Sequence, residues 1–522
     1  MEPLTNVLVI GADSADPELI DLWGAAGDLP NLMRLRARAA RGTVKNPYAI
    51  ESSSVWPTFH TGLLPGHQPN FDGPTVYNPA TYDFELPPSA DVPPPIWIRL
   101  SRAGKRCAVI DPPYVQLDSS INGLSIVDWS PHVPAEGTEF ATFRTYPEKL
   151  ADEVLDIVGP DPANGFSCEH RRFWTVEDYQ DFIAETLTRI EKRARLTRHL
   201  LAKGHWDYFQ VVFMELHCAG HHLWHLNDES HPSFDPKLKE ALGNPLRDCY
   251  KAVDAAIGEI LTDIDEKRTA VIFFASHGMG PLRTATGILD RALLRIEGMP
   301  DTNMREHFRR TFRPFWRGLP VRLREALLPA KTRALPAERS ASLAGSRQHR
   351  KFFEILAHNG TGAVRVNLAG RDPKGVVAPE DYNRVVDGVV RALRTFINVE
   401  TGEPLVEDIV RTTDRYTGEF VSRMPDLLVT WNRSAPIRVV RSPIYGTIRQ
   451  DFYTNRTGDH RPEGLFYAAG PSIVPQTINQ TVSPADFLPT IQAMLGVPKT
   501  AFASGAGGRP ILAIYPATRA AS

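Results

Sequence analysis

Short apolar runs that end in a polar, chemically reactive side chain recur along this chain of 522 residues. The first run, 7–12, is rich in branched residues, stops at Asp13 and precedes a helix-like stretch over 17–23. A buried strand followed by a helix is typical of a parallel α/β sheet, where ligands bind beyond the carboxyl ends of the strands. Asp13 is therefore a candidate metal ligand or acid/base, and its alternative role is that of a helix cap.

The same alternation of strand-like and helix-like patterns continues along the chain. Strands are predicted at 105–111, 208–214, 269–275, 363–367, 425–431 and 465–469. Helices are predicted at 29–35, 175–201, 244–265 and 379–396. We therefore predict a large single α/β domain with a mostly parallel sheet between helices.

Composition excludes several classes of protein. A formal net charge of -2 gives no electrostatic reason to expect a nucleic-acid polymer or a membrane as partner. The four cysteines form no CxxC pair, which argues against a disulfide framework or a thiolate zinc site. No apolar run reaches the roughly 20 residues that span a bilayer, and the N-terminus lacks the basic region and cleavage site of a secretory signal. A cytoplasmic location is expected.

A serine-rich segment follows the first strand and helices. Three successive serines at 52–54 precede Trp56-Pro57 and Thr61-Gly62, a pattern that predicts a polar loop leading into a helix. The N-terminus of a helix suits a phosphate or a developing alkoxide, because its N–H groups are unpaired and its dipole end is positive. Simple capping of the helix by a serine is the alternative.

Histidines gather after the strand predicted at 208–214. His217 and His221 are four residues apart, so on a helix both imidazoles project from one face and can chelate one ion. His222 and His225 fall off that face, and they are expected to support the ligands or lie at the surface.

Two later motifs add further candidates. Ser276 and His277 follow the strand predicted at 269–275, and His277 is expected to point into the same cleft as Asp13. His460, in the segment 457–464 before the last predicted strand, is one more candidate ligand.

With these motifs and the C-terminal segments 483–490 and 495–498, the chain resembles the type I phosphodiesterase/nucleotide pyrophosphatase branch of the alkaline phosphatase superfamily. The resemblance implies an alkaline-phosphatase-like three-layer sandwich with a mostly parallel central sheet. In that superfamily a nucleophilic Ser or Thr precedes a Thr-Gly pair by nine residues. Counting back from Thr61 selects Ser52 rather than Ser53 or Ser54.

The resemblance also implies two metal sites. One comprises His217, His221 and His460, and the other comprises Asp13, Ser52, Ser276 and His277. The family normally has an aspartate at the positions of His217 and Ser276. Three neutral imidazoles suit zinc, whereas the second site has lost a carboxylate and is expected to hold its ion less tightly. We expect one tight Zn²⁺ and a second ion that is weaker or absent, with Mn²⁺ as an alternative metal.

Nearby carboxylates could compensate for the lost charges or support the ligands. The candidates for this role are Glu51, Glu215 and Asp459, and Ser276 is a further candidate for supporting the ligands.

The implied reaction is an in-line attack by Ser52 on phosphorus, which gives a phosphoseryl intermediate that water then hydrolyses. The expected substrate is a small anionic phosphorylated molecule, a diester or nucleotide-like pyrophosphate rather than a monoester. Two alternatives stay open. One is a transferase or lyase of the same superfamily with an altered, single-zinc site, and the other is a catalytically silent binding protein.

A basic insertion is predicted late in the chain. We expect a catalytic core over 1–283 and 361–522 and an inserted helical cap over 284–360. The cap is rich in arginine and interleaved with aromatic residues (Arg305, Arg309, Arg310, Arg313, Arg317, Arg322 and Arg324). This pattern indicates either a solvated basic helix face or a lid that steers an anionic substrate.

Overall fold

A nine-stranded sheet forms the centre of the computed structural model, which describes residues 6–48, 50, 54–71, 75–131, 143–163, 173, 175–300, 347–355, 360–450, 456–499 and 506–514. The strand order is β20-β2-β19-β9-β1-β8-β5-β6-β7. The bounds are β1 Asn6–Ala12, β2 Ala40–Lys45, β5 Cys107–Ile110, β6 Gly123–Val127, β7 Arg144–Tyr146, β8 Tyr208–Phe213, β9 Thr269–Ala275, β19 Glu463–Ala469 and β20 Gln476–Val482. Only β7 and β19 of these strands run against the others, which confirms the predicted mostly parallel sheet.

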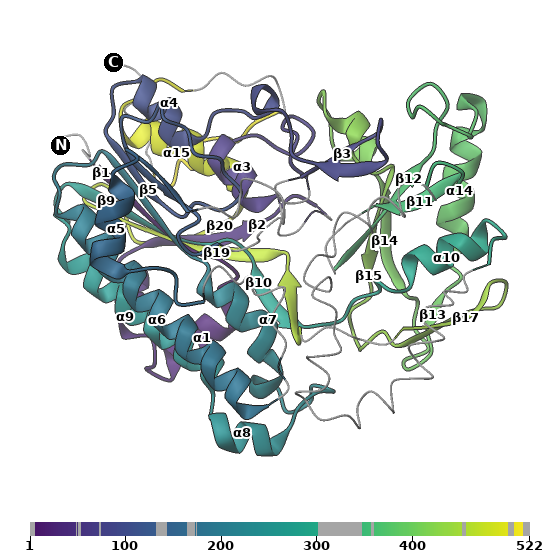
Figure 1. Cartoon of the computed structure of the whole chain (residues 1–522), viewed down its shortest axis with the longest axis horizontal. Coiled ribbons are helices and arrows are strands. Elements are labelled where there is room, and N and C mark those ends of the chain that lie inside the picture. Colours follow the sequence, from purple (N-terminus) through teal and green to yellow (C-terminus); the bar gives the residue numbers. More distant parts are fainter. Residues whose placement is uncertain are drawn as a thin grey trace.

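Helices cover both faces of this sheet and complete a three-layer sandwich (Figure 1). One face packs against α1 (Pro17–Ala25), α2 (Pro30–Ala37), α5 (Leu150–Val158), α6 (Val176–Leu201), α7 (Glu215–Asn227) and α9 (Pro245–Thr262). The other face packs against α3 (Val55–Thr61), α4 (Ile96–Arg102) and α15 (Phe487–Met494). Leu8 and Ile10 of β1 join the first apolar cluster, whereas Val7 and Val9 join the second. Burial on both faces explains why β1 is apolar throughout.

A second lobe stands beside the sandwich (Figure 1). It contains an antiparallel sheet in the order β11-β12-β15-β14, a small sheet β13-β16-β17, and two packed helices. The bounds are α10 Leu289–Ile296, β11 Phe352–Ile355, β12 Thr361–Val366, α14 Tyr382–Leu393, β13 Ile397–Asn398, β14 Val406–Arg411, β15 Leu427–Trp431, β16 Val439–Ser442 and β17 Gly446–Arg449. Strands β12 to β17 and helix α14 belong to this second lobe, although the predicted division assigns residues 361–522 to the core. The cap over 284–360 stays a prediction, because residues 301–346 lie outside the described chain.

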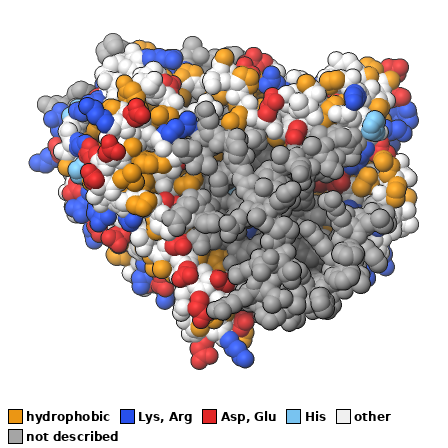
Figure 2. All heavy atoms as spheres, in the orientation of Figure 1, with side chains coloured by type: hydrophobic (Ala, Val, Ile, Leu, Met, Phe, Trp, Pro, Cys, Tyr) orange, Lys and Arg blue, Asp and Glu red, His pale blue; other side chains and the backbone are white. Residues whose placement is uncertain are grey.

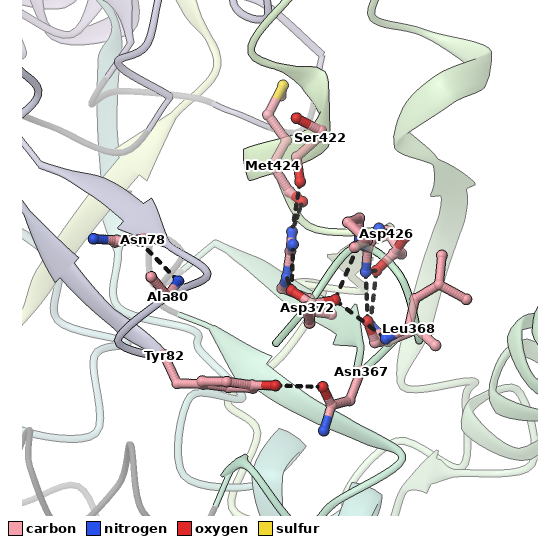
Figure 3. Close-up of polar contacts among 12 residues, drawn as sticks. Asn78, Ala80, Tyr82, Asn367, Leu368, Asp372, Ser422, Met424 and Asp426 are labelled. Carbon is pink, nitrogen blue, oxygen red and sulfur yellow. Dashed lines mark hydrogen bonds and ion pairs between the residues drawn. The ribbon is translucent and has the colours of Figure 1, made fainter. Parts of the chain in front are cut away.

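The hairpin of β3 (Val76–Asn78) and β4 (Asp83–Glu85) lies in the sequence between α3 and α4 of the sandwich, but it packs against the second lobe. The hydroxyl of Tyr82 donates to Oδ1 of Asn367 at 2.8 Å (Figure 3). It also accepts a hydrogen bond from the backbone N–H of Lys374 at 3.0 Å. Beside this contact, the buried guanidinium of Arg365 donates two hydrogen bonds to Asp372. The hydrogen bonds of Tyr82 thus connect the hairpin to the second lobe, and the Arg365–Asp372 pair lies within that lobe.

Positive and negative side chains are interspersed over the described part of the face drawn in Figure 2. Within the described part of the chain, no helix combines the length and apolar character needed to cross a membrane.

Candidate functional site

Three histidines form a buried cluster where β8 passes into α7. His217 and His221 project from α7, and His460 projects from β18 (Gly458–Arg461). One ring nitrogen of each lies within 4.8 Å of the others, and the Nε2 atoms of His217 and His221 are 3.1 Å apart. Three imidazole nitrogens at this spacing fit Zn²⁺, which in catalytic sites takes three protein ligands and keeps a fourth position open.

The backbone of β18 sets the orientation of His221. Nδ1 of His221 lies 2.8 Å from the carbonyl oxygen of Gly458, which can only accept a hydrogen bond, so Nδ1 carries the proton. The lone pair of Nε2 then faces His217. Metal-binding imidazoles almost always have this arrangement, in which the second ring nitrogen donates to a carbonyl, a carboxylate or water.

Two glycines let α7 and β18 approach so closely. A Cβ atom at Gly458 would lie 2.1 Å from the carbonyl oxygen of Gly220. This distance is too short for any residue with a side chain at position 458. A Cβ atom at Gly220 would lie 2.7 Å from the side chain of Met279 in β10 (Gly278–Pro281), the strand that pairs with β18. The glycines that precede His221 and His460 thus have a packing role beside the chemistry of the histidines.

Asp13 is buried at the end of β1 and lies beside His277. Oδ1 of Asp13 accepts hydrogen bonds from Trp56 Nε1 at 2.8 Å and from Ser276 Oγ at 2.6 Å. Nε2 of His277 lies 3.6 Å from the same oxygen. Ser276, which stands where an aspartate is expected from the resemblance, therefore donates a hydrogen bond to the remaining carboxylate.

The two groups of side chains adjoin each other. The ring centre of His277 is 4.2 Å from that of His460 and 6.4 Å from that of His217. The structure thus brings together most of the predicted site residues, namely Asp13, His217, His221, Ser276, His277 and His460. Their role as metal ligands stays a prediction.

Two carboxylates considered as compensating charges contact arginines. Glu215, the first residue of α7, accepts hydrogen bonds on Oε1 from Nε and Nη2 of Arg193, while Nη1 of Arg193 donates to Asp111. Burial alone would lower the pKa of Arg193, but the two carboxylates raise it above its usual value, so the guanidinium is charged. Asp459 is buried 3.8 Å from Nη1 of Arg433. Successive side chains of a strand point to opposite faces, so Asp459 and His460 point in different directions.

His222 and His225 are buried, so the surface alternative for them is wrong. His222 packs against Phe182, and His225 packs against Tyr179, both from α6. Burial lowers the pKa of His225 to about 4, which keeps this imidazole neutral.

Sequence reasoning missed Trp56, His60 and Arg193. In the sequence Trp56 is part of the serine-rich segment, and no pattern there predicts its hydrogen bond to Asp13. A buried tryptophan needs an acceptor for its N–H, and this requirement was the available signal. His60 stacks on Trp56, and burial lowers the pKa of His60 to about 3. Arg193 lies among many charged residues of α6, so the sequence pattern does not distinguish it from the exposed arginines of the same helix.

The proposed nucleophile Ser52 lies outside the described residues, together with Glu51 and Ser53. Ser54 is described and buried, and its hydroxyl donates to the carbonyl oxygen of Ile50 at 3.0 Å. The arginine-rich segment over 301–346 also lies outside the described residues.

The fold is that of an α/β protein of the alkaline-phosphatase-like class. The family model of type I phosphodiesterase / nucleotide pyrophosphatase matches residues 7–438, so the chain belongs to this family. Both the predicted family and the predicted fold class are confirmed. Membership indicates a phosphoester hydrolase of the phosphodiesterase/pyrophosphatase type.

Solved structures with a similar fold differ strongly in sequence. Phosphonoacetate hydrolase from Sinorhizobium meliloti 1021, in complex with phosphonoacetate, is 13% identical, with a TM-score of 0.52 over 94% of this chain and 96% of that one. Murine ectonucleotide pyrophosphatase/phosphodiesterase 5 is 12% identical, with a TM-score of 0.47 over 95% of this chain and 97% of that one. No curated protein matches the chain in sequence.

Proposed function

We propose that this protein is a metal-dependent hydrolase that cleaves a phosphodiester or a nucleotide-like pyrophosphate through a phosphoseryl intermediate on Ser52. The observation that carries the proposal is the buried cluster of His217, His221 and His460, with Asp13 and His277 directly beside it. Family membership supports the reaction class. A solved relative of similar fold is described with bound phosphonoacetate, which agrees with a small anionic phosphorus compound as substrate.

In this proposal the site residues bind two metal ions and supply the nucleophile. His217, His221 and His460 would hold a zinc ion, and Asp13, Ser52 and His277 would hold a second, weaker cation. When bound, these ions would stabilise the charge on the phosphoryl oxygens and lower the pKa of the nucleophile. The Ser52 oxygen attacks phosphorus in line as the bond to the leaving alcohol or phosphate breaks. Water then hydrolyses the phosphoseryl ester and restores the Ser52 hydroxyl.

The test combines turnover with metal analysis. The substrate is a generic aryl phosphodiester, and the variants are Ser52→Ala with Ser53→Ala and Ser54→Ala as matched controls. We expect Ser52→Ala to abolish turnover while leaving the melting temperature and the zinc content unchanged, and we expect milder losses in the two controls. Full activity in Ser52→Ala would refute the assignment of the nucleophile.

One observation favours a transferase or lyase as second candidate. Ser276 stands in place of an aspartate and donates to Asp13, so the second cation site carries one negative charge fewer than the family pattern implies. A cation held by one carboxylate is bound less tightly, so this site departs from the hydrolase pattern where the phosphoseryl ester is formed and resolved. Product analysis with added alcohols or amines separates the candidates, because transfer gives a new phosphoester or phosphoramidate and hydrolysis does not.

A further inference from the structure

Trp56 and Ser276 together restrain the carboxylate of Asp13. The indole N–H and the serine hydroxyl both donate to Oδ1, at 2.8 Å and 2.6 Å. Two donors on one oxygen, arriving from α3 and from the end of β9, restrict rotation of the carboxylate about its last bond. All three side chains are buried, and hydrogen bonds to a charged group are stronger where water is excluded.

Packing holds the indole of Trp56 in place. Phe59 and Phe274 contact it edge to face, with ring centres 5.8 Å and 5.4 Å away, and His60 stacks against it at 5.6 Å. On the β1 side, a Cβ atom at Gly11 would lie 2.6 Å from Cη2 of the indole. Because Gly11 has no side chain, β1, the strand that precedes Asp13, leaves room for the indole ring of Trp56.

We infer that Trp56 is a positioning residue, whose indole N–H holds the Asp13 carboxylate in the orientation in which Asp13 and His277 bind a divalent cation. The inference rests on the metal centre of the proposed function. Because Ser276 replaces a carboxylate, Asp13 supplies most of the negative charge at this position. The loss of its orientation therefore weakens the site more than it would weaken a site with two carboxylates.

The experiment removes the N–H while keeping the ring. Trp56→Phe is the simple variant, and benzothienylalanine at position 56 keeps the shape of the indole with sulfur in place of N–H. Trp97→Phe is the matched control, because Trp97 packs against His60 with ring centres 5.0 Å apart, in the same aromatic cluster. The dissociation constant of Mn²⁺ is measured by electron paramagnetic resonance on zinc-loaded protein, beside the melting temperature.

We expect Mn²⁺ binding to weaken by about 10- to 100-fold in both position-56 variants, the usual loss when a hydrogen-bond partner of a metal ligand is removed. Trp97→Phe should bind Mn²⁺ like the wild type. If Trp56→Phe fails to fold, the benzothienylalanine protein still decides the matter, because its core packing is unchanged.

Unchanged Mn²⁺ affinity in the benzothienylalanine protein would overturn the inference, even if Trp56→Phe bound Mn²⁺ weakly, since packing would then explain the effect. A wild-type protein that binds no Mn²⁺ would overturn both the inference and the second cation site. The zinc content, measured on the same samples, reports separately on the histidine cluster.

Discussion

Two uncharged side chains, those of His217 and Ser276, stand where the family normally has carboxylates. The histidine cluster offers three imidazole nitrogens as candidate ligands, whereas Asp13 and His277 offer a single carboxylate. We therefore expect close to one tightly held zinc per chain after dialysis, about the content of a single three-histidine site. Metal analysis by mass spectrometry tests this, and two equally tight ions would contradict it.

Substitutions in the histidine cluster and at the Asp13–His277 pair should affect different metal ions. His221→Ala should remove the zinc, whereas Asp13→Ala should leave the zinc bound and lower the activity. Ser276→Asp should raise the occupancy of the second metal, because it restores a charge beside Asp13. Zinc retained in His221→Ala would refute this account of the site.

Asp128, at the carboxyl end of β6, predicts a pH effect on stability. Burial, and then the charge of Asp111, raise the pKa of Asp128 to about 8. The pKa of an aspartate in the unfolded chain is near 4. When the pKa is higher in the folded protein, the free energy of unfolding falls as the pH rises from about 4 to about 8. Asp128→Asn mimics the protonated acid, so it should raise the free energy of unfolding more at pH 8 than at pH 5. Urea unfolding at both pH values measures this difference, with the exposed Asp156→Asn as control.

Among the elements, α7 and the β10–β18 pair carry the histidine cluster, and their contact depends on glycine. Gly458→Ala places a Cβ atom 2.1 Å from the Gly220 carbonyl oxygen, so the strand must move away from the helix. We expect the zinc affinity to fall by about 10- to 100-fold, as when the hydrogen-bond partner of a metal-binding histidine is displaced. Gly388→Ala is the control, because a Cβ atom there meets nothing within 4 Å inside α14. Equal zinc affinity in Gly458→Ala and Gly388→Ala would contradict the packing role.

The start of α7 is anchored by Arg193, which is fully buried between Glu215 and Asp111. Arg193→Met leaves two buried carboxylates without their cation, which should lower the free energy of unfolding by about 3–5 kcal/mol. Arg198→Met, on the same helix, removes an exposed ion pair to Asp263 and should have a much smaller effect. Urea unfolding compares the two variants, and similar losses would show that the buried network is unimportant.

The elements also show which patterns the sequence could predict. Strands β1, β8 and β9 were predictable because burial on both faces gives unbroken apolar runs. The pair of β10 and β18 was not, because Gly-Met-Gly-Pro and Gly-Asp-His-Arg have neither apolar runs nor strand propensity. Their pairing follows from contacts with α7 and not from local preference.

At the scale of the whole molecule, parallel topology explains why the site residues could be predicted at all. Asp13 and Ser276 are 263 residues apart, yet both follow neighbouring strands whose carboxyl ends meet at one edge of the sheet. Trp56 and Arg193 could not be assigned in this way, because they reach the site from helices, whose rotation about their axes depends on tertiary packing. Three elements of the second lobe, β12, α14 and β15, match segments predicted from the sequence, but their placement in the mostly parallel sheet of a single domain is wrong. They form a separate antiparallel sheet, and local apolar patterns do not show which sheet a strand joins.

An arginine-rich segment lies in the sequence between α10 and β11, two elements of the second lobe. If this segment steers an anionic substrate, replacing Arg309, Arg310 and Arg313 together by Gln should raise KM several-fold at low ionic strength. The difference from the wild type should shrink as salt is added, because the screening length falls from about 10 Å at 0.1 M to about 3 Å at 1 M. The matched control replaces three exposed arginines in and directly after α14, Arg384, Arg391 and Arg394, which removes the same total charge from the described part of the second lobe. A salt profile that is unchanged, or changed equally in the control, would favour a solvated basic face over a lid.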